Sequence, residues 1–149
     1  MTNPAQTSRR PFAHANFGSF DDLLQYQSHG LRGKCFVSEA LDTNGAEVSL
    51  NRLPAGTGMS FLHRHHRHEE IYIVTRGTGQ FVVDGDVFEV REGSVVRIDP
   101  PAARSLRASD NDDLHYICIQ ATSGTLSARQ ISDGEEAEGD LPWPAIPSA

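Results

Sequence analysis

The feature that most constrains the fold of this chain is the regular return of turn signals between residues 31 and 121. These signals stand about 8–12 residues apart and separate short apolar runs, as in antiparallel sandwiches and barrels. Asn44-Gly45 and Asp84-Gly85 suit tight hairpins, in which both central residues need a positive φ. Several runs are apolar at every position, which is typical of strands covered on both faces. The pattern predicts an all-β fold whose strands fall within residues 35–37, 48–53, 71–74, 81–83, 87–90, 95–98 and 114–119.

The N-terminal arm, residues 1–30, is predicted to contain one short helix. Ser19 is a residue type preferred at the N-cap, and Asp21 and Asp22 would lie in the first turn, where acidic side chains are favoured. Gly30 is a typical helix stop. We therefore expect a helix of about two turns that begins after Ser19.

The C-terminal segment, residues 122–149, differs in composition from the region before it. Residues 132–140 are acidic and contain glycine, and residues 141–149 carry three prolines around Trp143. We expect a flexible tail, or an arm laid on a neighbouring surface, with Trp143 packing it down. The predicted domain organisation is thus one barrel, residues 31–121, between flexible termini.

The overall composition narrows the classes of partner. The chain has 149 residues, 13 basic and 20 acidic, and a formal net charge of −7, which argues against nucleic acid as a partner. No segment approaches the roughly 20 apolar residues of a membrane span, and the polar N-terminus lacks the apolar core of a secretory signal. We therefore expect a cytoplasmic protein that is not bound to a membrane. Cys35 and Cys118 do not form a Cys-x-x-Cys pair, and we expect both to be buried, reduced thiols.

A histidine-rich run, His63-Arg64-His65-His66-Arg67-His68-Glu69-Glu70, carries the clearest chemical signal. Side chains alternate along a strand, so His63 and His65 would share one face, and a carboxylate a few residues later can return to the same pocket after a bend. Two imidazoles and one carboxylate on one face of a metal, with open positions left over, suit ferrous iron and related divalent metals. The run therefore predicts a metal site.

Two stretches of the chain resemble the signatures of the cupin family. His63-x-His65-x4-Glu70-x6-Gly77, preceded by the glycine-containing stretch 54–58, is similar to the first signature. The stretch from Gly93 to Arg104, with its glycine, strand and proline frame, is similar to the second. The resemblance covers about residues 45–120, most of the part that we expect to fold.

The resemblance implies a small double-stranded β-helix, or jelly-roll barrel, with a divalent metal inside. Its metal ligands would be His63, His65 and Glu70, together with a histidine late in the second signature. That last position falls on Arg104, which cannot ligate a metal because it stays protonated. His115, in the predicted last strand, is the candidate for the missing fourth ligand, although a lone strand histidine is more often a packed residue.

Other residues near the predicted site have open roles. His66 and His68 form a second His-x-His pair, but no carboxylate follows at a matching distance, so we expect both to lie outside the ligand set. Tyr72 shares the face of Glu70 and is a candidate substrate-binding residue. Arg104 could be a surface residue at the barrel mouth, or it could point inward and bind a ligand carboxylate bidentately.

The leading functional hypothesis is a single-domain cupin that binds a divalent metal (iron, manganese, nickel, cobalt or zinc) and a small anionic or oxygen-rich molecule. The ligand set favours oxygenase-type chemistry over isomerisation, and no catalytic residue can be named. The alternatives are a non-catalytic binding or sensor module with an incomplete metal site, and a structural cupin that acts in assembly. The resemblance also implies a homodimer, in which open sheet edges would be covered by pairing or by exchanged arms.

Overall fold

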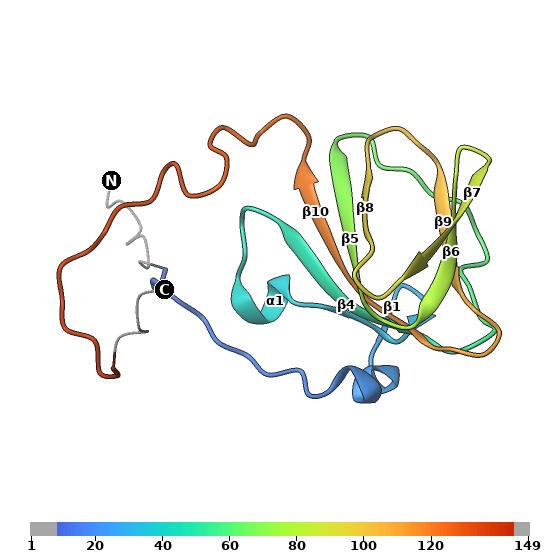
Figure 1. The fold of residues 1–149 in the computed structure, drawn as a ribbon, viewed down its shortest axis with the longest axis horizontal. Helices are drawn as coiled ribbons and strands as arrows, with labels where there is room; N and C mark the ends of the chain where they lie inside the picture. The colour runs from blue at the N-terminus through green and yellow to red at the C-terminus, as the bar shows by residue number, and fades with distance from the viewer. Residues whose placement is uncertain (1–8, 145–149) are drawn as a thin grey trace, which may run out of the picture.

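The computed structural model describes residues 9–144, which form a β barrel with two short helices (Figure 1). In chain order the elements are the 3₁₀ helix η1 (Phe20–Gln25), β1 (Gln27–Ser28), β2 (Leu31–Arg32), β3 (Lys34–Phe36), α1 (Ser38–Leu41), β4 (Glu47–Leu53), β5 (His68–Arg76), β6 (Thr78–Val83), β7 (Asp86–Arg91), β8 (Val95–Ile98), β9 (Arg104–Ala108) and β10 (Leu114–Thr122). The predicted all-β fold is confirmed. No helix of the described residues is long and apolar enough to cross a membrane.

Two antiparallel sheets face each other across one core. The larger sheet has the strand order β3-β4-β10-β5-β8, and the smaller has the order β7-β6-β9. Figure 1 shows the smaller sheet closing over β5 and β8. Side chains that point inward from both sheets form the core, because alternate residues of each strand face the same side. They include Tyr72, Val74, Phe81, Val90, Ile98, Leu106, Leu114 and Tyr116.

One of the two predicted hairpins is present and the other is not. Asp84 and Gly85 join β6 to β7 with φ values of 48° and 94°, as a tight turn requires. Asn44 and Gly45 form no hairpin, and neither has a positive φ. The short helix α1, which the turn pattern did not indicate, ends at Leu41 with Asp42 as its C-cap, just before them, and the chain then enters β4.

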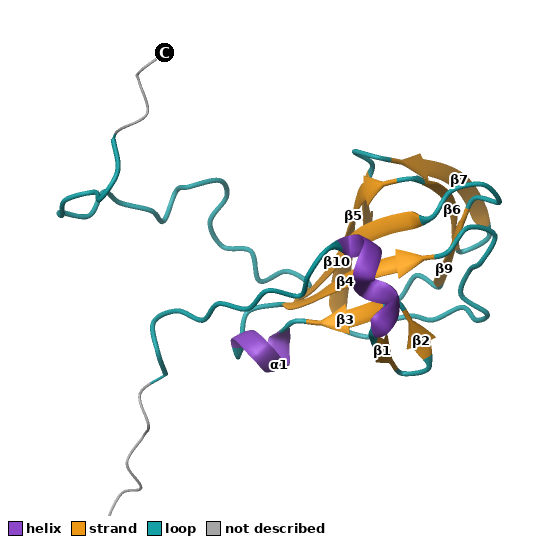
Figure 2. Ribbon diagram, turned by 90° about the horizontal axis from the view of Figure 1, so that it is seen from below, coloured by secondary structure: helices purple, strands orange, loops and turns teal. Residues whose placement is uncertain are grey.

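The predicted N-terminal helix begins where expected but is shorter and tighter. Ser19 caps η1 by accepting a hydrogen bond from the backbone N–H of Asp21. The helix ends at Gln25, well before Gly30, because the backbone N–H of Tyr26 bonds back to Leu23 and the chain enters the β1–β2 hairpin. η1 lies against β3 and β4 (Figure 2), and its residue Leu23 is buried.

After β10 the chain runs away from the barrel without further helices or strands up to residue 144 (Figure 1). Trp143 is 64% exposed, so the prediction that it packs the tail down is wrong. Residues 1–8 of the N-terminal arm and 145–149 of the tail lie outside the described residues. Cys35 and Cys118 are both free and buried, as predicted.

Candidate metal centre

The two histidines of the candidate site lie in the loop between β4 and β5, not on a strand as the sequence suggested. His63 is fixed by reciprocal backbone hydrogen bonds with Arg104, the first residue of β9, at 3.1 and 2.9 Å. This bridge gives the loop a strand-like course, so the two imidazoles still point the same way. Their ring centroids lie 5.5 Å apart.

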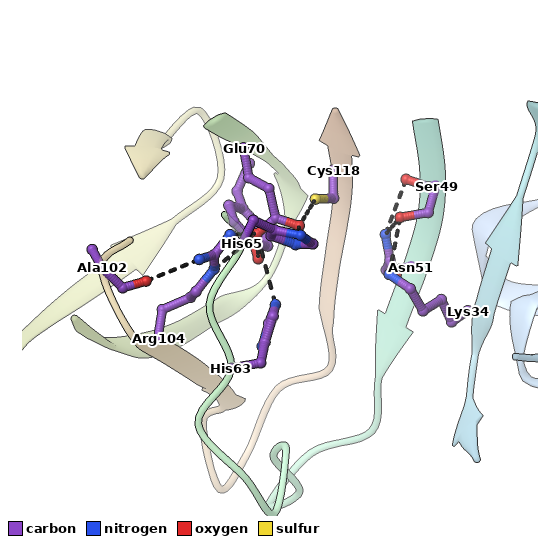
Figure 3. A network of polar contacts seen from close by, with 10 residues as sticks. Lys34, Ser49, Asn51, His63, His65, Glu70, Ala102, Arg104 and Cys118 are labelled. Carbon is purple, nitrogen blue, oxygen red and sulfur yellow. Dashed lines mark hydrogen bonds and ion pairs between the residues drawn. The ribbon is translucent and has the colours of Figure 1, made fainter. Parts of the chain in front are cut away.

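Glu70 brings the third donor from β5. Its side chain is almost completely buried and points into the barrel, on the face it shares with Tyr72. Oε1 of Glu70 lies 3.0 Å from Nε2 of His65, and Oε2 lies 3.8 Å from Nε2 of His63 (Figure 3). One donor atom from each of the three residues falls within 4.8 Å of the other two. The predicted ligand set is therefore brought together inside the barrel.

Further donors from three strands surround the same carboxylate. Tyr72 donates its hydroxyl hydrogen to Oε2 of Glu70 at 2.5 Å. Arg104 donates from Nε at 2.9 Å, and from Nη2, to that same oxygen, while its Nη1 donates to the carbonyl of Ala102. Cys118 on β10 donates its thiol hydrogen to Oε1 at 3.6 Å. Arg104 is completely buried, so the surface interpretation of this residue is wrong, and its guanidinium faces Glu70 (Figure 3).

These contacts determine the protonation states in the site. Burial alone would raise the pKa of Glu70, but His63, Tyr72 and Arg104 together hold that pKa well below its ordinary value, so Glu70 is ionised. Burial lowers the pKa of His65 despite the nearby Glu70 charge, which favours the neutral imidazole. Burial, together with the charge of Glu70, raises the pKa of the Cys118 thiol to about 12. An ionised carboxylate and a neutral imidazole are the forms that bind metals.

Comparison with known proteins identifies the family. The sequence model of the cupin domain family matches residues 49–120 of this chain. A cupin protein of known structure from Bacteroides fragilis is 34% identical, and the match covers 77% of this chain and 98% of that one with a TM-score of 0.68. This chain is a cupin. A double-stranded β-helix protein from Klebsiella pneumoniae shares the fold at 18% identity, with a TM-score of 0.60 over 74% of this chain and 93% of that one.

Two curated proteins are also similar to this cupin. An uncharacterised protein from Methanocaldococcus jannaschii is 32% identical over 87 residues, which cover 55% of this chain and 69% of that protein. The oxalate-binding protein of Thermotoga maritima is 27% identical over 81 residues, which cover 54% of this chain and 66% of that protein.

The donor set of this cupin fits a divalent metal held by three protein ligands. His65 Nε2 and Glu70 Oε1 lie 3.0 Å apart, at hydrogen-bond distance. This distance is also close to the spacing of neighbouring donors at right angles around a metal with bonds of about 2.1 Å. Oε2 of Glu70 accepts from Tyr72 and Arg104, whereas Oε1 contacts the His65 nitrogen and the weakly donating Cys118 thiol, which makes Oε1 the freer ligand atom. Nδ1 of His63 is buried without a hydrogen-bond partner, so this histidine lacks the usual orienting contact of a metal ligand.

His115 is not brought together with the other three residues. It is buried, but its Nε2 lies 3.1 Å from Nη2 of Arg76 and its ring stacks on Phe20 of η1. His115 therefore occupies the packed position that a lone strand histidine more often takes, and it does not supply a fourth ligand here. His66 is exposed on the loop, and neither His66 nor His68 belongs to the group of three.

Sequence reasoning did not place Cys118 at the site. The pairing of β5 with β10 sets Cys118 directly opposite Tyr72, and Gln120 opposite Glu70. Residues that are directly paired share a face of the sheet, so Cys118 reaches the carboxylate. β10 is apolar on both alternating faces around this point, and no signal in the sequence showed which residues turn inward or which strand they meet.

Proposed function

We propose that this cupin holds one divalent metal ion with His63, His65 and Glu70 and binds a small, oxygen-rich anion there. The observation that carries the proposal is the convergence of two imidazole nitrogens and one ionised carboxylate from two separate elements. Iron, manganese, nickel, cobalt and zinc all accept such ligands, and two histidines with one carboxylate favour oxygenase-type chemistry over isomerisation. A bound metal would supply a Lewis acid or a centre for activating dioxygen.

The charges in the barrel support an anionic ligand. Ionised Glu70 and protonated Arg104 cancel each other, and an imidazole that binds a metal is neutral and adds no charge. A divalent metal would therefore leave an excess of two positive charges in a buried site, and an anion would offset them. The relative that is named an oxalate-binding protein makes oxalate a reasonable first probe.

The substrate-binding roles predicted for Arg104 and Tyr72 are kept as part of the proposal, in a modified form. Both side chains contact Glu70 through its Oε2 atom, so we propose that they act mainly by fixing the carboxylate. Two N–H groups of Arg104 form none of these three hydrogen bonds and could meet a bound anion. A cytoplasmic location and a homodimer also stay predictions.

A second candidate function is a non-catalytic binding or sensor module. The observation that favours it is the Arg104 guanidinium, which already neutralises Glu70 and satisfies one of its oxygens without any metal. In this case the barrel would bind a small ligand with its metal site incomplete.

Metal content separates the two candidates. The protein is purified without chelators, and its metals are measured by plasma mass spectrometry. The proposal predicts close to one metal ion per chain, and oxalate binding by calorimetry that is lost after the metal is stripped. A chain that carries less than about a tenth of an equivalent, and binds oxalate equally well after stripping, would favour the non-catalytic module.

A further inference from the structure

A second polar cluster lies on the inner face of the larger sheet, on its edge strand β3 and the neighbouring strand β4. Its centre is Lys34 on β3, the only lysine among the 13 basic residues of the chain. Lys34 is paired with Asn51 on β4, and its ammonium reaches two side chains of that strand. Nζ donates to Oγ of Ser49 at 3.0 Å and to Oδ1 of Asn51 at 3.1 Å (Figure 3).

The two acceptors are held rigidly. Ser49 and Asn51 are almost completely buried. The amide nitrogen of Asn51 donates to the carbonyl and the hydroxyl of Ser49, at 2.9 and 3.0 Å, and lies 3.4 Å from the carbonyl of Tyr116. The Asn51 amide therefore has a fixed orientation, with its oxygen turned towards Lys34.

The unused hydrogen-bonding capacity of this cluster consists of donors. An ammonium has three N–H groups, and the described residues accept from two of them. The hydroxyl oxygen of Ser49 accepts from both Lys34 and Asn51, and its own hydrogen has no acceptor among residues 9–144. The missing partner of the cluster must therefore be an acceptor.

The charge of Lys34 points to the same kind of partner. Burial lowers the pKa of Lys34, and the negative charges of Glu70 and Glu47 oppose this only in part. Within the described residues no carboxylate forms an ion pair with it. Its ammonium lies 4.8 Å from the centre of the Phe36 ring, which is a weak substitute for a counter-ion. Lys34 is half-buried, and a lysine that loses contact with water without gaining a paired acid is unusual.

The cluster opens onto the same inner face as the candidate metal centre. Ser49 is paired with Cys118, and Cys118 is paired with Tyr72, so these side chains share one face across β4, β10 and β5. The backbones of β3 and β5 are separated by three strand spacings, about 14 Å, and the side chains between them shorten that gap. Figure 3 shows the two clusters on either side of β10, the strand that carries Cys118.

We propose that Lys34 and Ser49 form an anion-binding subsite that takes a carboxylate group of a small acid. Identifying this carboxylate with part of the ligand proposed above rests on the proposed function, but the subsite itself needs no metal. The competing occupant is water, because a cavity of about 10 Å³ beside Lys34, Asn51 and Tyr116 has room for one molecule.

The single lysine makes the test direct. Protein labelled with ¹³C-lysine gives one set of lysine side-chain signals, all from Lys34. Metal-stripped protein is titrated with malonate at constant ionic strength, with sodium chloride as the reference. We expect a saturable shift of the Lys34 signals and a higher Lys34 pKa in the malonate-bound protein, because a bound anion stabilises the ammonium. Signals that do not respond to malonate would show that water alone fills the position and would overturn the proposal.

Matched variants test the contact itself. Lys34→Met should weaken malonate binding at least tenfold by calorimetry, roughly 1.4 kcal/mol, and Ser49→Ala should weaken it less. Arg91→Met is the control, because it removes the same charge from an exposed position on β7, away from the cavity beside Lys34. Equal losses in Lys34→Met and Arg91→Met would reveal a general charge effect and contradict the subsite.

The outcome is separable from that of the metal proposal. A Lys34 response to malonate in protein that never binds metal would retain the subsite and reject the metal centre. Full metal occupancy, together with Lys34 signals that do not respond to malonate, would retain the metal centre and reject the subsite.

Discussion

At Glu70 a buried carboxylate collects donors from distant parts of the chain. Tyr72 lies two residues away, but Arg104 and Cys118 come from strands 34 and 48 residues further on. Burying an ionised carboxylate is costly unless it is paired and hydrogen-bonded, and here Arg104 and Tyr72 provide both. Glu70 can therefore stay ionised, which a metal ligand requires.

Removing the Arg104 guanidinium should be strongly destabilising in metal-free protein. Arg104→Met leaves the Glu70 charge buried without its partner, and we expect the free energy of unfolding to fall by about 3 kcal/mol or more. Arg107→Met is the matched control, because Arg107 is on the same strand but exposed, and its loss should cost no more than about 0.5 kcal/mol. Urea unfolding in the presence of a chelator measures both. Similar stabilities of the two variants would contradict the assigned role of the Arg104–Glu70 pair.

The sequence predicted the local part of this site but not its long-range part. His63, His65 and Glu70 are close together in the chain, and their spacing was enough to group them. Spacing selected three side chains that the structure brings together, even though it assigned the histidines to a strand instead of a loop. The partners of Glu70 on β9 and β10 depend on which strands become neighbours, and that is decided by the packing of the whole barrel.

Among the elements, η1 is attached to the barrel by a cluster of polar and aromatic contacts. Phe20 stacks on the buried His115 of β10, and Arg76 of β5 contacts both His115 and Asp21. Arg52 of β4 contacts Asp21 and Asp113. Because most of these ion pairs are exposed, they contribute little, and the attachment depends mainly on the buried Leu23 and on the stacked His115.

His115 should make the attachment of η1 sensitive to acid. Burial, and then repulsion from Arg76 and Arg52, lowers the pKa of His115 despite Asp21 and Asp113 nearby. The unfolded chain therefore binds the proton more readily, and stability falls as the pH drops below about 6.5, the ordinary histidine value. His115→Gln keeps an acceptor for Arg76 but cannot titrate.

Urea unfolding at pH 7.5 and 5.5 measures the effect. We expect a smaller loss of stability on acidification in His115→Gln than in the unchanged protein, with the remainder due in part to His65, whose pKa is also lowered. An identical loss in the two proteins would show that His115 does not contribute.

The elements that were predicted correctly are those determined by a few adjacent residues. The Ser19 cap and the Asp84-Gly85 turn depend on a few adjacent residues, and both are present. Asn44-Gly45 carries an equally strong turn signal, but these residues connect the helix α1 to β4 and do not join two paired strands. The end of η1 was missed because the β1–β2 hairpin competes for the residues before Gly30.

At the scale of the whole molecule, the two sheets leave edges that the single chain does not cover. β7 and β8 are edge strands of the two sheets, and Val87 and Val95 on them are both largely exposed. Edges of this kind are commonly covered by pairing with a second copy.

We therefore expect a homodimer. Light scattering at tens of micromolar should give twice the 16.3 kDa mass of one chain. Val95→Lys, which puts a charge on the β8 edge, should favour the monomer, whereas Leu126→Lys in the exposed tail should not. A monomer across this concentration range in the unchanged protein would refute the expectation.

The central claim, a metal held by His63, His65 and Glu70, is tested most directly by comparing two single-histidine variants. His63→Ala removes a proposed ligand, and His66→Ala removes an exposed neighbour from the same loop. Each variant is loaded with metal, dialysed and analysed by plasma mass spectrometry, with circular dichroism to confirm folding. We predict that His63→Ala loses most of its metal and that His66→Ala keeps nearly one ion per chain. Equal metal retention in the two folded variants would contradict the claim.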